Sequence, residues 1–262
     1  MHTFPLIARV CLFTLLGLLG AARVCLAEQP LPAWKETGRL ASADATQGAA
    51  ADDQWVYAIS NRFVARHDRQ SGKLLARSVG EATHLNGGFF FEGKLYCAHS
   101  NYPAKPEKSE IKVLDPQTMQ LTTWKDLGAS DGSLTWAIHH QGAWWLNFAF
   151  YGDDAAKTYL ARYDEGREKK RWTYPENIVR AFDKRSASGG IWRDGKLLVT
   201  GHDAREIYVL SLPDAGAVLR YVGTAPAPFT GQGFATDPKT GGLIGIDRAA
   251  RKLVFAQQDR SP

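Results

Sequence analysis

Short apolar stretches, separated by turns that contain glycine, recur along the chain at a spacing of about 40 residues. Each repeat opens with a small, polar segment, passes through a tight turn into a strongly apolar strand, and then alternates apolar with polar positions. The opening segments lie at 46–49, 85–88, 131–134, 187–190 and 231–234. Helical periodicity is missing from these repeats, so the pattern predicts short antiparallel strands.

The second and third strands of each repeat carry the clearest signal. The apolar strands lie at 55–59, 95–98, 144–146, 197–199 and 243–246, and the alternating strands at 62–66, 110–114, 158–162, 206–210 and 252–255. A polar turn and a fourth strand follow in the earlier repeats. Sheets of this kind have two faces to bury, so neighbouring repeats pack on each other, and a closed ring hides their edges. The sequence therefore predicts an all-β, five-bladed β-propeller.

The two ends of the chain fit such a ring. The fifth repeat stops after its third strand, close to the C-terminus, and an additional strand at 37–42 precedes the first repeat. We expect this N-terminal strand to pair with 252–256 as the outer strand of the fifth blade, which would close the propeller.

The first 27 residues have the three parts of a secretory signal peptide. A short head with Arg9 precedes an apolar run at 10–20, and small residues lead to Ala27, after which the chain becomes polar. The run is shorter than the roughly 20 apolar residues that a spanning helix needs. We therefore expect a signal peptide at 1–27, a single β-propeller domain at 28–262, and a periplasmic or secreted protein with no membrane attachment after cleavage.

Cleavage changes the composition of the chain. Cys11 and Cys25 leave with the signal, so Cys97 remains alone, which suits a bacterial periplasm better than a disulfide-rich secreted domain. Cys97 lies in an apolar strand, where cysteine is usually a small buried hydrophobe. The 32 basic and 27 acidic residues form no block of like charge, and no nucleic-acid-binding motif is present. We expect a monomer that binds no nucleic acid.

Polar residues gather where an up-and-down propeller would bring them together. The start of each inner strand and the loop between the second and third strands lie on the same face. Both kinds of segment carry amides, hydroxyls, imidazoles and guanidiniums, which favour a small-molecule or peptide ligand at the mouth of the central channel. The candidate ligand-binding residues are Gln47, Asn61, Arg62, His84, Asn86, His99, Asn147, Ser188, Gln232 and Arg248. A structural channel filled with water is the alternative.

Histidines and aspartates at the same mouth offer a second chemistry. His202 or His99 would act as a general base oriented by Asp203 or Asp247, so His202, Asp203 and Asp247 are the candidate catalytic residues. These side chains and His84 are also of the types that bind divalent metals, although their spacing matches no metal signature. The sequence makes no cofactor evident and leaves a divalent metal open.

The inner-strand segments 46–48, 85–89 and 231–234 resemble those of the plant and bacterial type of glutaminyl cyclase. That family is a five-bladed propeller that cyclises an N-terminal glutamine, so the resemblance implies this fold and a cyclase activity. The inner strands of the family carry an essential glutamate, whereas no inner strand here has one. The chain is also similar to uncharacterised exported bacterial propellers that are often named cycloisomerases.

Three functions fit these observations. The first is an exported propeller that binds a small polar molecule or peptide at the channel mouth without turnover. The second is an enzyme of lyase, cyclase or lactonase type that uses histidine and aspartate at the same mouth. The third is a protein-interaction scaffold that uses aromatic side chains, which make up 11% of the chain, although many of them fall on strand positions that should be buried.

Overall fold

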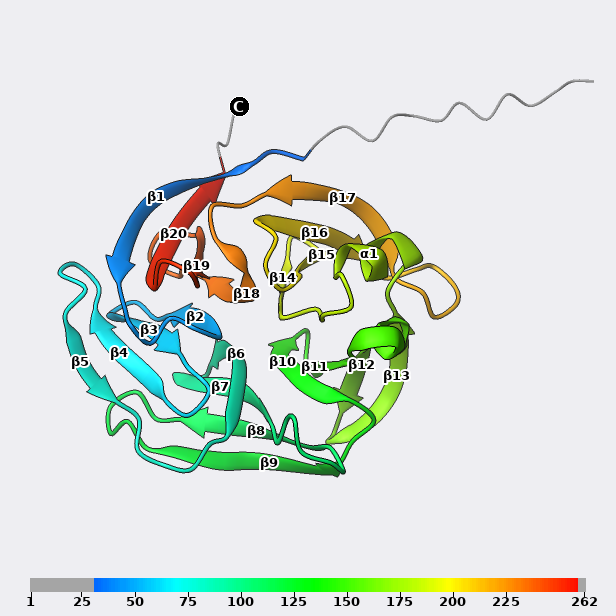
Figure 1. Ribbon diagram of the computed structural model, residues 1–262, viewed down its shortest axis with the longest axis horizontal. Helices are drawn as coiled ribbons and strands as arrows, with labels where there is room; N and C mark the ends of the chain where they lie inside the picture. The colour runs from blue at the N-terminus through cyan, green and yellow to red at the C-terminus, as the bar shows by residue number, and fades with distance from the viewer. Residues whose placement is uncertain (1–30, 259–262) are drawn as a thin grey trace, which may run out of the picture.

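The computed structural model describes residues 31–258, most of which lie in β-strands. Three sheets have four strands each, and a fourth sheet has eight. Figure 1 shows that the sheets stand radially around a common centre, with β2, β6, β10, β14 and β18 innermost and the last strand of each sheet at the rim. This all-β, propeller-like arrangement agrees with the strand pattern of the sequence.

The four-stranded sheets follow chain order from the centre outward. The first contains β6 (His84–Phe91), β7 (Lys94–Ser100), β8 (Lys108–Leu114) and β9 (Leu121–Ala129). The second contains β10 (Ser133–His140), β11 (Ala143–Ala149), β12 (Tyr159–Asp164) and β13 (Arg167–Thr173). The third contains β14 (Gly189–Arg193), β15 (Lys196–Thr200), β16 (Glu206–Ser211) and β17 (Arg220–Pro226).

The eight-stranded sheet brings the beginning and the end of the chain together. Its order is β1 (Trp34–Ala41), β20 (Lys252–Gln258), β19 (Leu243–Asp247), β18 (Thr230–Thr236), β2 (Gly48–Ala51), β3 (Trp55–Ile59), β4 (Val64–Asp68) and β5 (Leu74–Arg77). Two short helical segments, η1 (Gly152–Lys157) and α1 (Glu176–Ala181), interrupt the strand pattern in connections around the second and third four-stranded sheets.

The inner strands approach one another so closely that only small residues fit between them. β18 and β2 are joined in parallel through one residue pair, Gly233 with Gly48. A Cβ atom added to Gly233 would lie 2.7 Å from the Cα atom of Gly87, and one added to Gly190 would lie 2.6 Å from the Trp136 ring. The glycines that open the repeats are therefore required by packing at the centre.

Apolar side chains fill the spaces between neighbouring sheets. Ile59, Cys97 and Ile246 belong to one buried cluster, although they come from strands far apart in the sequence. Burial raises the pKa of the Cys97 thiol to about 12, so the thiol stays protonated and packs as an apolar group. This agrees with the interpretation of Cys97 as a core residue.

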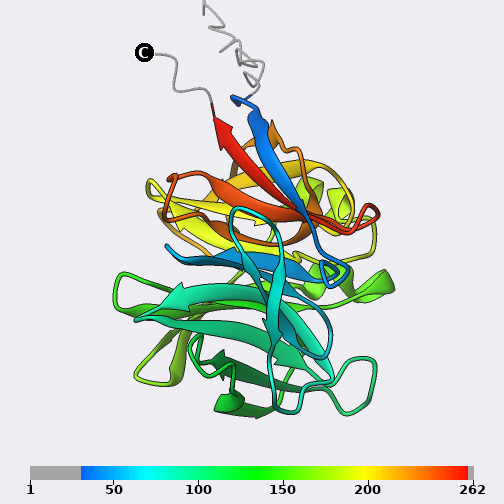
Figure 2. The same ribbon diagram turned by 90° about the vertical axis from the view of Figure 1, so that its left-hand side faces the viewer.

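β1 and β20 lie side by side, as Figures 1 and 2 both show. Their antiparallel pairing runs from Trp34 opposite Gln258 to Ala41 opposite Lys252. The expected pairing of 37–42 with 252–256 is thus present, and β1 begins earlier than the sequence pattern indicated. The expected signal peptide at 1–27 lies outside the described residues. Within 31–258, no helix has the length and apolar character needed to cross a membrane.

Candidate functional site

A cavity of about 180 Å³ lies where the inner strands begin, with walls that come from all four sheets. Its lining residues are Gln47, His84, Asn86, Tyr102, Tyr151, Arg185, Ser186, Ser188, His202, Gln232 and Arg248. The structure therefore brings seven of the candidate residues together: Gln47, His84, Asn86, Ser188, His202, Gln232 and Arg248.

Strand order explains why residues so distant in sequence meet here. Gln47 directly precedes β2, and Gln232 lies near the start of β18. His202 lies two residues after the end of β15, and Arg248 directly follows β19; both of these strands are the second strands of their repeats. Because antiparallel neighbours run in opposite directions, the start of a first strand and the end of a second strand lie at the same edge of the sheet.

His202 has a partner on each ring nitrogen. Its Nδ1 lies 2.7 Å from Oδ2 of Asp203, and its Nε2 lies 3.2 Å from Nη1 of Arg248. A guanidinium only donates hydrogen bonds, so Nε2 accepts from Arg248 and the ring proton lies on Nδ1, from which it is donated to Asp203. The ring of His202 is thus held between Arg248 and a carboxylate that is itself 68% exposed at the rim.

Three amide side chains from three different inner strands are held by bonds from their NH₂ groups. Gln47 donates to Oδ1 of Asn61, Asn86 donates to the carbonyl oxygen of Leu134 at 3.0 Å, and Gln232 donates to the carbonyl oxygen of His202 at 2.8 Å. These bonds fix which end of each amide is the oxygen. Asn86 and Gln232 are also buried, so their positions are well defined.

Aromatic side chains form one wall of the cavity. The ring centroids of His84 and Tyr102 are 5.4 Å apart, and those of Tyr102 and Tyr151 are 5.1 Å apart. Burial, together with the positive charge of Arg248, lowers the pKa of His84, which is therefore neutral at pH 7. Burial raises the pKa of Tyr151 to about 12, so its hydroxyl keeps its proton and remains a hydrogen-bond donor.

Asp247 belongs to an ion pair outside the cavity lining. Its carboxylate accepts hydrogen bonds from Nη2 of Arg205 at 2.8 Å and from the backbone N–H of Ala250 at 3.1 Å. The bond from Arg205 lowers the pKa of Asp247. As the last residue of β19, Asp247 is still within the sheet, whereas the next residue, Arg248, reaches the cavity. Asp247 is therefore not placed to orient His202.

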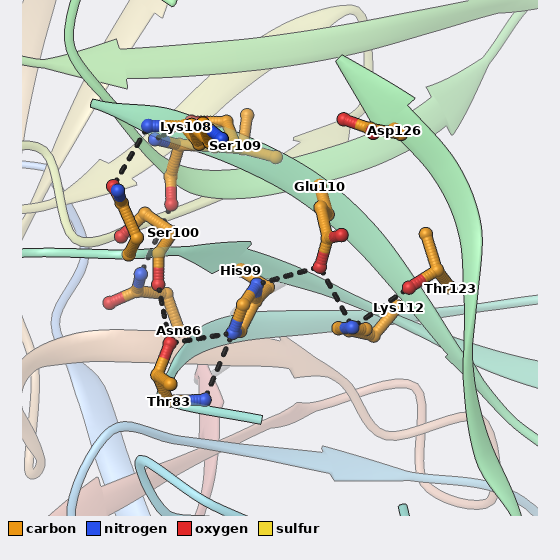
Figure 3. Close-up of polar contacts among 12 residues, drawn as sticks. Thr83, Asn86, His99, Ser100, Lys108, Ser109, Glu110, Lys112, Thr123 and Asp126 are labelled. Atoms are coloured by element: carbon orange, nitrogen blue, oxygen red, sulfur yellow. Dashed lines mark hydrogen bonds and ion pairs between the residues drawn. The ribbon is translucent and has the colours of Figure 1, made fainter. Parts of the chain in front are cut away.

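His99 also lies outside the cavity lining, as a buried member of the polar network of Figure 3. Its Nε2 accepts a hydrogen bond from the backbone N–H of Thr83 at 3.0 Å, and its Nδ1 lies 3.1 Å from Oε2 of Glu110. The same Glu110 oxygen lies 2.8 Å from Nζ of Lys112. Burial lowers the pKa of His99 to about 4. β7 continues past His99, so this imidazole lies within the strand ladder, where its bonds hold the sheet together, rather than in the loop beyond it.

The remaining candidates lie around the cavity without lining it. Asn147 is fully buried, donates to Oγ1 of Thr135 at 2.9 Å and accepts from the Tyr174 hydroxyl at 2.7 Å, so it joins neighbouring segments of the core. Asn61 is exposed and acts through its bond from Gln47. Arg62 is exposed and outside the lining.

Four lining residues were not among the sequence candidates. Tyr102 and Tyr151 follow the second strands β7 and β11, so the strand pattern pointed to their loops without singling them out. Arg185 and Ser186 follow α1, in an insertion that has no counterpart in the other repeats. Among the described residues, the histidines and acids proposed as metal ligands do not gather into a group of three or more.

No protein family and no curated protein matches this sequence. Among solved structures, the glutaminyl cyclase of Myxococcus xanthus is similar, with a TM-score of 0.60 and 10% identity over 88% of this chain and 99% of that one. The RS223 β-xylosidase is similar with a TM-score of 0.53 and 11% identity over 84% of this chain and 94% of that one. At such identities the likeness shows the fold alone, which is propeller-like and of the glutaminyl cyclase type.

Proposed function

We propose that this protein is an exported five-bladed propeller that binds a small polar molecule in the cavity at the mouth of its central channel. The observation that carries the proposal is the convergence of polar side chains from all four sheets on one cavity. Asn86, Ser186, Ser188 and Gln232 are among them and are buried. Burial of polar groups costs free energy unless they are satisfied, and a bound polar ligand would satisfy those that face the cavity.

Preorganisation of the site supports binding over a simple water channel. The amide groups of Gln47, Asn86 and Gln232 and the imidazole of His202 are each oriented by a second group in the protein. Side chains locked in this way bind a ligand without losing further conformational freedom.

The five-blade count and the closure of the ring are part of the proposal. The single-pair junction between β18 and β2 supports dividing the eight-stranded sheet into two blades, one ending with β1 and the other with β5. Export rests on the sequence of residues 1–27, which has the three parts of a signal peptide.

An enzyme of lyase, cyclase or lactonase type is the second candidate function. The observation in its favour is His202, which is oriented by Asp203 and lines the cavity. An imidazole in this tautomer is a general base once a substrate displaces Arg248 from its Nε2.

A thermal-shift screen of small polar compounds tests the binding proposal. A compound present at one hundred times its dissociation constant stabilises the protein by about 2.7 kcal/mol, which raises the melting temperature by several degrees. Gln47→Phe fills the cavity and should remove the shift, whereas Gln70→Phe, at an exposed turn, should retain it. A compound that stabilises both variants equally binds elsewhere, and a run of such compounds would reject the proposed site.

A further inference from the structure

The axial cavity has an unbalanced positive charge. Arg185 and Arg248 line it, and none of its lining residues is an aspartate or glutamate. Within 31–258, neither guanidinium forms an ion pair, in contrast with the half-buried Arg69, which lies 2.7 Å from a carboxylate oxygen of Asp237. The side chain of Arg248 contacts the imidazole of His202.

The charge of Arg248 also acts on a neighbouring lining residue. Burial and, after it, the positive charge of Arg248 lower the pKa of His84. On its other side, His202 contacts the carboxylate of Asp203, which lies at the exposed rim. With two guanidiniums and no acid in its lining, the cavity favours an anionic ligand, and a carboxylate can pair with guanidiniums through charge-assisted hydrogen bonds.

The arginines need hydrogen-bond acceptors from a ligand, whereas the three amides need donors. Their NH₂ groups donate to protein oxygens, and no described residue donates a hydrogen bond to the amide oxygens of Gln47, Asn86 or Gln232. Asn86 and Gln232 are 8% and 3% exposed, and both line the cavity. The ligand should therefore supply hydrogen-bond donors to these oxygens.

We propose, on the basis of the function proposed above, that the ligand is a small hydroxy-carboxylate. Its carboxylate binds Arg185 and Arg248, and its hydroxyl groups donate to the amide oxygens of the inner strands. A protonated amine would also donate to these oxygens, but it would lie near two guanidiniums with no lining carboxylate to offset the repulsion. A hydroxyl group donates without adding charge, so the site favours a hydroxy acid over an amino acid.

Isothermal titration calorimetry with matched four-carbon probes tests the inference. Threonate carries both a carboxylate and hydroxyls, threitol carries hydroxyls alone, and butyrate carries the carboxylate alone. We expect threonate to bind at least about tenfold more tightly than either analogue, because each analogue lacks one set of bonds. Arg185→Gln and Arg248→Gln should each weaken threonate binding by about tenfold or more, since each removes a charge-assisted contact.

Arg167→Gln is the matched control, because Arg167 is exposed at the start of β13, has no ion pair within the described chain, and gives the same change in net charge. Melting curves exclude unfolding as the cause of any loss. Equal binding of threitol would overturn the anionic assignment and leave the binding proposal intact, whereas equal binding of butyrate would overturn the role of the amide oxygens. Absence of binding by threonate would overturn the ligand class, and the compound screen would then decide the binding proposal on its own.

Discussion

His99 and His202 lie near the ends of equivalent second strands, yet their neighbours give them different properties. His99 is buried among Thr83, Glu110 and Lys112 inside a sheet, while His202 follows its strand and lines the cavity. The contrast follows from one difference, which is that β7 continues past His99 whereas β15 ends before His202.

His99 should make folding stability depend on pH. Its pKa falls from an ordinary 6.5 to about 4 in the folded chain, so the unfolded chain binds the proton more strongly. Its contribution to stability is complete above pH 6.5 and is lost as the pH falls from 6.5 towards 4. Urea unfolding of the wild type and of His99→Gln across this range should differ in pH dependence by about 3 kcal/mol. Identical pH profiles for the two proteins would contradict this assignment.

Variants of His202 distinguish the two proposed functions, an enzyme and a protein that binds its ligand without turnover. If a compound from the screen is converted, His202→Gln should lower turnover by about 100-fold or more while the dissociation constant changes little. Asp203→Asn, which weakens the support of the ring, should lower turnover by a smaller factor. Mass spectrometry of the incubated compound measures both. Conversion that persists unchanged in His202→Gln would exclude this residue as the base.

At the scale of elements, β1 is the strand whose removal we expect to affect aggregation and thermal stability most. It covers β20, and without it the backbone groups of β20 would form an open edge that invites pairing with another chain. A mature chain that starts at Ala43 should therefore aggregate or melt at a lower temperature than one that starts at Leu31, which keeps β1. Light scattering and thermal melting compare the two. A monomeric, equally stable product starting at Ala43 would show that β1 is dispensable.

The sequence pattern predicted the strands well because each depends on local periodicity and on the turns beside it. The pairing of β1 with β20 followed from counting strands, and the meeting of Gln47, Asn86 and Gln232 followed from their equal places in the repeats. Asp247 and His99 failed as cavity residues because a shift of one position at a strand end moves a side chain from a loop into the sheet. Arg185 was missed because it lies in an insertion without a repeat counterpart.

At the scale of the whole molecule, we propose that the protein is exported and that its ligand reaches the cavity at the channel mouth from outside the cytoplasm. Intact-mass analysis of the protein expressed in a Gram-negative host should give a product that starts near Glu28 in the periplasmic fraction. A cytoplasmic or membrane-bound product that retains residues 1–27 would contradict export and leave the cavity unaffected.

The central claim is that polar side chains from separate sheets form one binding site for a small polar ligand. A crystal structure of the protein soaked with the tightest compound from the screen tests it most directly. The account predicts ligand density in the axial cavity, within hydrogen-bond distance of Gln232 and Arg248. Ordered ligand density found elsewhere, for example in the peripheral groove lined by Trp34, Arg193 and Gln257, with water alone at the channel mouth, would contradict it.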